Sequence, residues 1–174
     1  MKASVFVGAS VDGFIARPDG GLDWLPNDPE DHGYNEFIAS VDALVIGRNT
    51  YETVLGFGGW AYGEKPVFVL SSRPLTPPPA GAVVDHLSGE PADIVAQLAA
   101  RGIGRIYVDG GVTIQRFLRA GLIQRLIVTR VPVLIGEGIP LFGPLPGDVR
   151  LTHVSTRSFP SGLVQSEYRL GGGA

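Results

Sequence analysis

A short apolar segment followed by two glycines constrains the fold more than any other part of the chain. Residues 106–108 (Ile-Tyr-Val) are β-prone and apolar throughout, as expected of a buried parallel strand. Residues 109–111 (Asp-Gly-Gly) end that run, and residues 113–118 then place Ile114, Phe117 and Leu118 on one face of a helix. The order of strand, glycine turn and helix predicts an open α/β sheet, in which ligands bind at the carboxyl ends of the strands.

The Gly110-Gly111 turn has two interpretations. Paired glycines let a backbone approach a phosphate closely, and the free N–H groups at a helix start attract anions. A plain strand–helix turn that uses glycine for its backbone freedom is the simpler interpretation of this motif taken alone.

Two other short apolar strands end in polar residues of the same kind. Residues 43–46 lead into Gly47-Arg48-Asn49-Thr50, and residues 65–70 lead into Ser71-Ser72-Arg73. The ends of parallel strands share one edge of a sheet, so the three turns together could bind a pyrophosphate and one extra phosphate. That pattern predicts a dinucleotide with a 2′-phosphate, hence NADPH. The alternative is a set of surface arginines and ordinary helix caps.

The remaining chain predicts more elements of one α/β domain spanning residues 1–174, with residues 171–174 frayed. Expected strands cover residues 3–9, 82–85 and 122–133, expected helices cover residues 27–40 and 91–101, and residues 149–156 and 163–170 read as a C-terminal antiparallel pair. Residues 134–142 read as an apolar loop.

Composition excludes several classes of function. The chain has 174 residues, a net charge of −3 and no cysteine, which rules out disulfides, thiolate metal sites and a cysteine nucleophile. Its three histidines are scattered, so no metal site is expected. The lack of a basic cluster argues against nucleic-acid or membrane-surface binding, and no apolar run is long enough to span a membrane. A cytoplasmic protein is expected.

Several motifs together resemble the RibD C-terminal/dihydrofolate reductase-like family. They lie at residues 11–16, 23–25, 40–52, 71–73, 109–111 and 133–142. The resemblance implies a three-layer α/β fold with a mostly parallel, mixed eight-stranded sheet, flanking helices and a C-terminal antiparallel strand pair. It implies a stand-alone bacterial member, without the fused deaminase of bifunctional forms, that often forms a homodimer.

The resemblance also implies the activity. Family enzymes use NADPH to transfer a hydride to a C=N-type bond of a pteridine or pyrimidine, as dihydrofolate reductases and the 5-amino-6-(5-phosphoribosylamino)uracil reductases of riboflavin biosynthesis do. The expected function is therefore NADPH-dependent reduction of a small heterocycle. The alternatives are an NADPH-binding protein without turnover, acting as a sensor or dimeric scaffold, and a broad nitro or quinone reductase.

Site residues follow from the resemblance by position. Ala9 and Ile15 would flank the nicotinamide, and Trp24 would be a lid residue or a loop anchor packed on the core. The other expected cofactor-binding residues are Gly47, Arg48, Asn49, Thr50, Leu70, Ser71, Ser72, Arg73, Asp109, Gly110, Gly111, Val112 and Thr113.

The expected catalytic acid is Asp31, with Asp28 as the alternative. Dihydrofolate reductases carry such an acid on the first helix, where it assists protonation. Acids in a first helical turn also complement the helix dipole, so a purely structural role competes with this assignment. Riboflavin-pathway reductases have a glutamate where this chain has Asp109.

Overall fold

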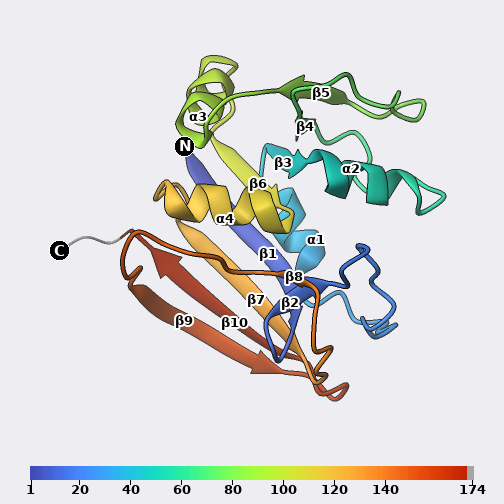
Figure 1. The fold of residues 1–174 in the computed structure, drawn as a ribbon, viewed down its shortest axis with the longest axis vertical. Helices are drawn as coiled ribbons and strands as arrows, with labels where there is room; N and C mark the ends of the chain where they lie inside the picture. Colours follow the sequence, from blue (N-terminus) through green and yellow to red (C-terminus); the bar gives the residue numbers. More distant parts are fainter. Residues whose placement is uncertain (172–174) are drawn as a thin grey trace.

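An eight-stranded sheet with the strand order β5-β4-β3-β6-β1-β7-β10-β9 forms the centre of residues 1–171, the part of the chain that the computed structural model describes (Figure 1). Its strands are β1 (Lys2–Ser10), β3 (Ala43–Gly47), β4 (Val67–Leu70), β5 (Val84–Leu87), β6 (Arg105–Asp109), β7 (Arg125–Val131), β9 (Leu151–Ser158) and β10 (Val164–Leu170). A second, two-stranded antiparallel sheet joins β2 (Phe14–Ala16) to β8 (Ile139–Pro140).

The strand pairing confirms the predicted mixed, mostly parallel sheet. From β5 through β7, every neighbouring pair is parallel. Strand β10 then pairs antiparallel with both β7 and β9. Because the six parallel strands point the same way, the turns after β3, β4 and β6 meet at one edge of the sheet.

Helices cover both faces of the sheet. One apolar layer lies under α3 (Pro91–Ala100) and α4 (Gly111–Arg119), and the other lies under α1 (Tyr34–Ala39) and α2 (Arg48–Leu55). Side chains alternate between the two layers along each strand. On β6, Ile106 and Val108 therefore face the α3/α4 layer, whereas Tyr107 faces the α1/α2 layer. Asp109, two residues further on, points to the same side as Tyr107.

The predicted helix over residues 27–40 is wrong in its first half. Helix α1 begins only at Tyr34, because His32 and Gly33 have left-handed backbone conformations, with φ angles of 53° and 85°. Asp28, Glu30 and Asp31 therefore lie in an irregular segment before the helix and not in its first turn.

Other boundaries shift by a few residues. Strand β5 lies two residues later than the predicted 82–85, and β7 is shorter than 122–133. The predicted loop 134–142 contains β8, whose pairing with β2 is helped by Asp12, which accepts hydrogen bonds from the backbone N–H groups of Ile135 (3.3 Å) and Gly136 (2.8 Å). Of the expected frayed end, Gly171 lies outside any helix or strand, and residues 172–174 lie outside the described residues. No helix within residues 1–171 is long and apolar enough to cross a bilayer.

Candidate active site

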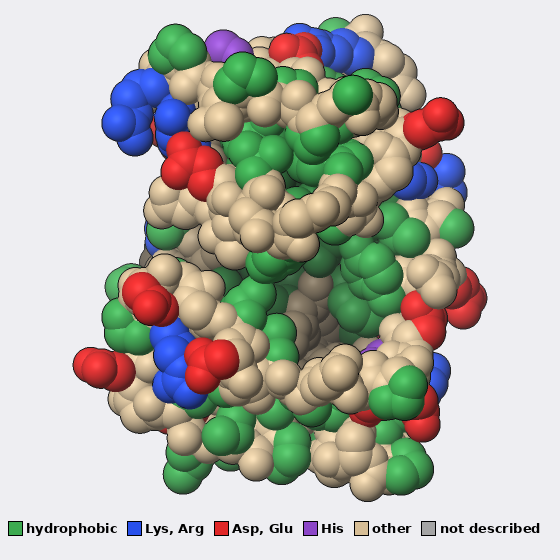
Figure 2. Space-filling model, turned by 90° about the vertical axis from the view of Figure 1, so that its right-hand side faces the viewer, with side chains coloured by type: hydrophobic (Ala, Val, Ile, Leu, Met, Phe, Trp, Pro, Cys, Tyr) green, Lys and Arg blue, Asp and Glu red, His purple; other side chains and the backbone are tan. Residues whose placement is uncertain are grey.

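A cavity of about 930 Å³ lies at the edge of the sheet where the turns after β3, β4 and β6 meet. In Figure 2 the molecule is hollowed on one face, and hydrophobic side chains line the inside of the hollow. Its walls are the ends of these strands, α2, the start of α4 and the segment that follows β2. Cavities of this size hold cofactors and small ligands.

The structure brings nearly all predicted cofactor-binding residues to this cavity. Its wall includes Ile15, Gly47, Arg48, Asn49, Thr50, Leu70, Ser71, Ser72, Arg73, Asp109, Gly110, Gly111, Val112 and Thr113. Ala9 does not line it, because its side chain is fully buried in the α3/α4 layer. Val7 and Gly8 form the wall from β1 instead.

Two helix starts face the cavity and lie against each other. Neither α2 nor α4 has a side-chain hydrogen bond at its N-cap or an acidic residue in its first turn, within the described part of the chain. Their N-caps, Gly47 and Gly110, pack closely on the other helix: a Cβ on Gly47 would lie 3.0 Å from Thr113 Oγ1, and one on Gly110 would lie 2.6 Å from Thr50 Oγ1. Uncapped N–H groups with the positive end of two helix dipoles make this a suitable place for a pyrophosphate.

Two features require glycine at position 110: the close contact with Thr50 leaves no room for a Cβ, and the φ angle of 96° is one that other residues rarely adopt. We expect Gly110→Ala to lower the free energy of unfolding by about 2 to 3 kcal/mol in urea denaturation, from strain and from the clash with Thr50. Gly121→Ala is the matched control, since Gly121 also has a positive φ (68°) but nothing within 4 Å of its missing Cβ. That control is expected to cost about 1 kcal/mol. Equal losses for both variants would contradict the importance of the Thr50 contact.

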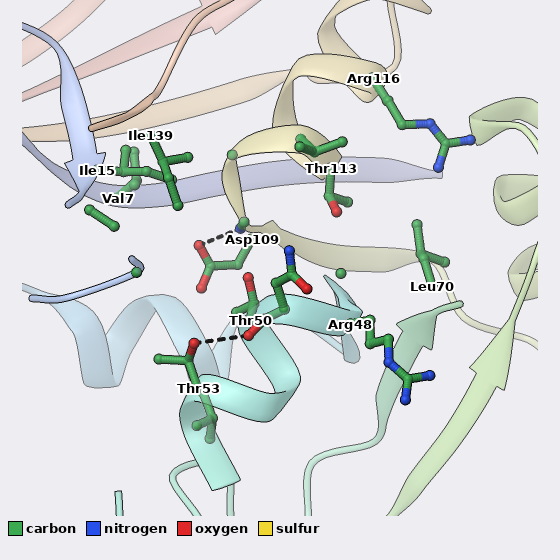
Figure 3. Close-up of a pocket in the computed structure, with 18 of the residues that line it drawn as sticks. Val7, Ile15, Arg48, Thr50, Thr53, Leu70, Asp109, Thr113, Arg116 and Ile139 are labelled. Carbon is green, nitrogen blue, oxygen red and sulfur yellow. Dashed lines mark hydrogen bonds between the residues drawn. The ribbon is translucent and has the colours of Figure 1, made fainter. Parts of the chain in front are cut away.

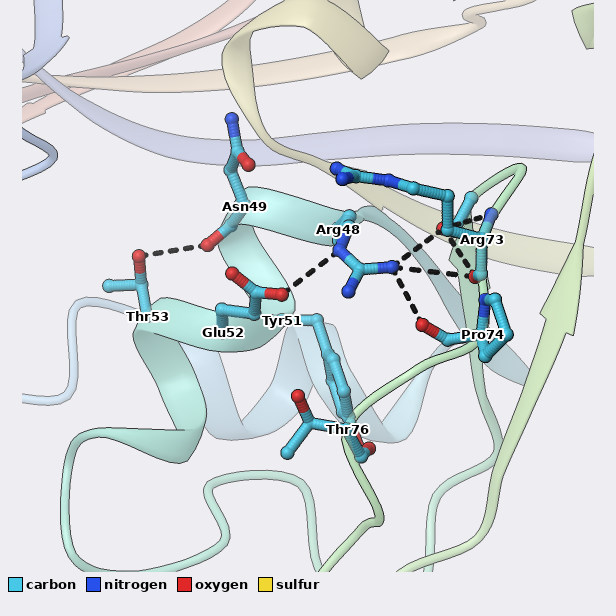
Figure 4. A network of polar contacts seen from close by, with 9 residues as sticks. Arg48, Asn49, Tyr51, Glu52, Thr53, Arg73, Pro74 and Thr76 are labelled. Atoms are coloured by element: carbon cyan, nitrogen blue, oxygen red, sulfur yellow. Dashed lines mark hydrogen bonds and ion pairs between the residues drawn. The ribbon is translucent and has the colours of Figure 1, made fainter.

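The arginines at the cavity differ in what they already bind. The Arg48 guanidinium donates to Glu52 Oε1 (2.9 Å), Ser71 Oγ (3.2 Å) and the carbonyl oxygen of Pro74 (2.8 Å), so it ties the loop after β4 to α2 (Figure 4). Arg73 is exposed, and its side chain extends toward the start of α2 without a hydrogen bond or ion pair to any described residue. Among residues 1–171, Arg73 is therefore the cavity-lining arginine whose guanidinium is free to bind a ligand beside Ser71 and Ser72.

Sequence reasoning missed Arg116 and the turn after β5. Arg116 Nη2 donates to the carbonyl oxygen of Gly89 (2.9 Å), and both residues line the cavity. In Figure 3, Arg116 and Arg48 lie on the side of Leu70, and Val7 and Ile15 lie on the opposite side. A polar turn directly after a fourth parallel strand was the available signal, but β5 was predicted to end before it.

Neither predicted catalytic acid reaches the cavity. Asp31 is exposed and accepts a hydrogen bond from the backbone N–H of Asn35 (3.0 Å), so it supports the start of α1. Asp28 lies beside His32, with Oδ2 3.1 Å from Nε2. A hydrogen bond from Ser161 is the main cause that lowers the pKa of Asp28, which makes this carboxyl a poor proton donor near neutrality.

Trp24 also lies away from the cavity. Its indole packs on the cluster formed by Val131, Phe159 and Leu163, as the loop-anchor alternative predicted. Leu22 and Leu25, its neighbours along the chain, line the cavity in its place.

Of the three carboxyl groups that line the cavity within the described chain, Asp109 is partly buried, whereas Asp19 and Glu90 are exposed. Asp109 lies at the end of β6 and points toward the side of Val7 and Ile15 (Figure 3). Its Oδ1 accepts a hydrogen bond from the backbone N–H of Gly110 (2.9 Å). Burial raises the pKa of Asp109, and this effect outweighs the hydrogen bond from the Gly110 N–H that favours the carboxylate. The neutral acid therefore persists to a higher pH than for an exposed aspartate.

The matching family model is that of the RibD C-terminal domain, and the match covers residues 2–165. The chain belongs to the RibD C-terminal domain family. A relative in Bacillus subtilis, the uncharacterized protein YwjB, is 30% identical, with 96% of this chain and 97% of that protein covered. Sequence similarity therefore extends over almost the full length of both chains.

Solved structures support the same fold. A Shewanella sp. PV-4 protein with a provisional name in riboflavin biosynthesis superposes with a TM-score of 0.90 at 39% identity, covering 98% of this chain and 99% of that one. The dihydrofolate reductase of Enterococcus faecalis, solved with NADP(H), superposes with a TM-score of 0.66 at 22% identity, covering 97% and 96%. The RibD C-terminal domain thus has the dihydrofolate reductase-like fold that the resemblance implied.

The raised pKa of Asp109 predicts how the stability of this RibD C-terminal domain depends on pH. A carboxyl whose folded-state pKa is raised contributes stability that is present below its unfolded pKa and is lost as the pH rises through the folded pKa. We expect Asp109→Asn to remove this loss, so the variant gains melting temperature relative to wild type at pH values above the raised pKa but not at acidic pH. Thermal denaturation at several pH values measures the difference. A difference that does not change with pH would contradict the buried-acid assignment.

Proposed function

We propose that this RibD C-terminal domain is an NADPH-dependent reductase that transfers a hydride to a small heterocycle of the pterin or pyrimidine type. The observation that carries the proposal is the composition of one cavity. Cations and two uncapped helix starts lie at one end, and a carboxyl group that favours its neutral form lies in the wall toward the other. The cations and helix starts suit the phosphates of an extended dinucleotide, and the carboxyl group can supply the proton that reduction of a C=N bond requires.

The chain's residues fit NADPH in chemical type and in order along the sheet edge. Arg73 and Ser72 would bind the 2′-phosphate, because an unpaired guanidinium beside a hydroxyl provides charge-assisted hydrogen bonds. The starts of α2 and α4 would bind the pyrophosphate through backbone N–H groups. Ile15 and Gly8 would bound the nicotinamide, with Val7 beside them.

Arg48 has a different proposed role from the one suggested by the sequence. Its guanidinium is already bound to Glu52 and to the loop after β4. We therefore propose that Arg48 positions Ser71 and Arg73 for the cofactor and adds positive potential near the pyrophosphate, while Arg73 reads the 2′-phosphate.

Asp109 is the proposed proton donor in place of Asp31. When bound, NADPH supplies the hydride that adds to the carbon of the C=N bond. The Asp109 carboxyl would donate its proton to the nitrogen, so that C=N becomes CH–NH, and the carboxylate would regain a proton from solvent. Its raised pKa keeps the proton available, and the neighbouring phenol groups of Tyr62 and Tyr107, whose own pKa values are raised by burial, stay neutral.

A screen for turnover tests the proposal. NADPH oxidation is followed by nicotinamide absorbance with a panel of dihydropterins, pterins and aminopyrimidines, using wild type and Asp109→Asn in parallel. Oxidation that depends on one class of heterocycle and on Asp109 supports the reductase. Tight NADPH binding without oxidation by any compound would instead favour a binding protein without turnover, and equal oxidation with quinones or nitro compounds in both proteins would favour a broad reductase.

A further inference from the structure

We infer that the substrate of this site is an uncharged planar heterocycle that carries neither a phosphate nor a carboxylate. The inference rests on the proposed reductase function and makes its substrate class more specific. It comes from the distribution of charged side chains between the two ends of the cavity.

Positive charge is confined to the end where the cofactor phosphates would bind. Among residues 1–171, three cations line the cavity: Arg48, Arg73 and Arg116. Arg48 contacts Ser71 and Pro74 after β4, and Arg116 contacts Gly89 after β5. Strands β4 and β5 are the last two on their side of the sheet, so all three cations lie at this end.

The opposite end, here called the substrate lobe, has walls of another kind. Its lining residues are Phe6, Pro18, Asp19, Gly20, Leu22, Leu25, Thr53, Val54, Phe57, Tyr62, Tyr107 and Asp109. The segment after β2 and helix α2 come together here, since a Cβ on Gly20 would lie 3.9 Å from Thr53 Oγ1. Within the described chain, the acidic and basic side chains of the substrate lobe are Asp19, which is exposed, and Asp109, whose raised pKa favours the neutral carboxyl.

Cations near the substrate lobe are already engaged. Arg17 precedes the lining residue Pro18, but its Nε and Nη2 donate to the two carboxylate oxygens of Asp23 at 2.6 and 3.0 Å. Arg130, on β7 beside β1, donates to the carbonyl oxygen of Ser10 at 3.2 Å. A substrate anion in the lobe would lose water and lie near the Asp19 carboxylate, and no cation among the described residues that line the lobe would compensate, which is unfavourable.

The two substrate types that the family resemblance suggests each carry an anionic group. The phosphoribosylaminouracil of riboflavin biosynthesis has a phosphate, and dihydrofolate has glutamyl carboxylates. The apolar and aromatic walls of the substrate lobe suit the flat ring of either compound. The charges of the lobe suit neither the phosphate nor the glutamyl carboxylates. The substrate that fits therefore keeps the ring, lacks the anionic group and directs the nitrogen of its C=N bond at Asp109.

Matched ligand pairs test the inference. Binding is measured by calorimetry in the presence of NADP⁺, and kcat/KM is measured with NADPH, for 5-amino-6-ribosylaminouracil with and without its 5′-phosphate and for 6-methyldihydropterin against dihydrofolate. We expect the tail-free member of each pair to bind more tightly, by about threefold or more. Tighter binding of the phosphorylated or glutamylated member in either pair would overturn the inference.

A designed cation provides the second test. Phe57 is 58% exposed in the substrate lobe, so Phe57→Arg places a guanidinium there with little loss of packing. We expect this variant to raise the affinity for the tailed member relative to the tail-free member by about tenfold. Val83→Arg, at an exposed apolar residue outside the cavity lining, should leave the ratio as in wild type. An unchanged ratio in Phe57→Arg would overturn the inference.

The outcomes separate this inference from the proposed function. If NADPH binds and the tailed compounds are preferred, the inference fails while the reductase proposal stands. If NADPH binds and neither member of either pair binds, the substrate lobe does not accept these rings and the inference is again overturned. If NADPH itself does not bind, the proposed function fails and the inference falls with it.

Discussion

Replacing Asp109 by asparagine is expected to lower kcat for heterocycle reduction by about a hundredfold to ten-thousandfold, the usual contribution of a positioned general acid. Asparagine has nearly the same shape and can still accept the hydrogen bond that Gly110 N–H donates to Asp109 Oδ1. It has no acidic proton to donate to the substrate nitrogen. NADPH affinity should therefore change by less than about twofold, and steady-state kinetics with a direct binding measurement separate the two effects.

The dependence of activity on pH should have a definite direction if Asp109 is the proton donor. Because the acid must be protonated, wild-type activity should be high below the raised pKa of Asp109 and should fall as the pH rises through it. The Asp109→Asn variant should show no such fall. Asp31→Asn is the matched control, since Asp31 is exposed and bonds to Asn35 outside the cavity, and it should retain activity within about twofold. If Asp31→Asn loses more activity than Asp109→Asn, the assignment of the acid is wrong.

The second large effect is expected from Arg73→Ala, which should weaken NADPH binding by about tenfold to a hundredfold and NADH binding by about twofold or less. NADH lacks the 2′-phosphate, so it has no group for this guanidinium to bind. Arg73 suits the test better than Arg48, because its side chain has no hydrogen bond or ion pair to the described residues that the substitution would break. Titrations that follow nicotinamide fluorescence give both dissociation constants.

The control for Arg73→Ala is Arg119→Ala. Arg119 is an exposed arginine in the last turn of α4, outside the cavity lining. Its replacement by alanine removes the same charge from the protein as Arg73→Ala does. Affinities for NADPH and NADH should be close to wild type in this control. Equal losses of NADPH and NADH affinity in Arg73→Ala would refute the 2′-phosphate role and indicate that the residue supports the cavity in another way.

The sheet, and the edge at which the turns after β3, β4 and β6 meet, were predictable because local sequence and tertiary structure agree there. Short apolar strands are typical of a parallel sheet, and the turns after them were expected to meet because the carboxyl ends of parallel strands lie at one edge. Close packing explains part of what looked like a phosphate motif: the glycines at 47 and 110 each pack on a threonine of the neighbouring helix. Sequence alone could not separate this steric need from ligand binding.

Asp31 and Asp28 were predicted at the site because the sequence pattern favours a first helix that begins at residue 27, whereas neither residue lines the cavity. Asp28, Glu30 and Asp31 have the pattern of a first helical turn, which local preference favours. Tertiary packing instead gives left-handed backbone to His32 and Gly33, and the helix starts at Tyr34. A single carboxyl at the end of a buried strand, Asp109, was visible in the sequence, but its entry into the cavity depends on the alternation along β6 that places it on the side of Tyr107.

The other missed residues come from segments without a local pattern. Tyr62 reaches the cavity from an irregular loop, and Arg116 reaches it from the second turn of α4, where an arginine reads as a solvent-facing residue. Gly89 was missed because the residues of β5 are less apolar than those of the inner strands, so the end of that strand was placed two residues early. The position of each of these residues at the cavity depends on contacts with residues that are distant in the sequence.

Whether the three strand-end turns form an NADPH site can be measured by titrating the purified wild-type protein with NADPH and, in parallel, with NADH. Nicotinamide fluorescence reports both. We expect micromolar binding of NADPH and binding of NADH that is weaker by about tenfold or more, because only NADPH has a 2′-phosphate for Arg73 to bind. Failure of both dinucleotides to bind would contradict the proposed NADPH site and show that the turns serve the fold alone.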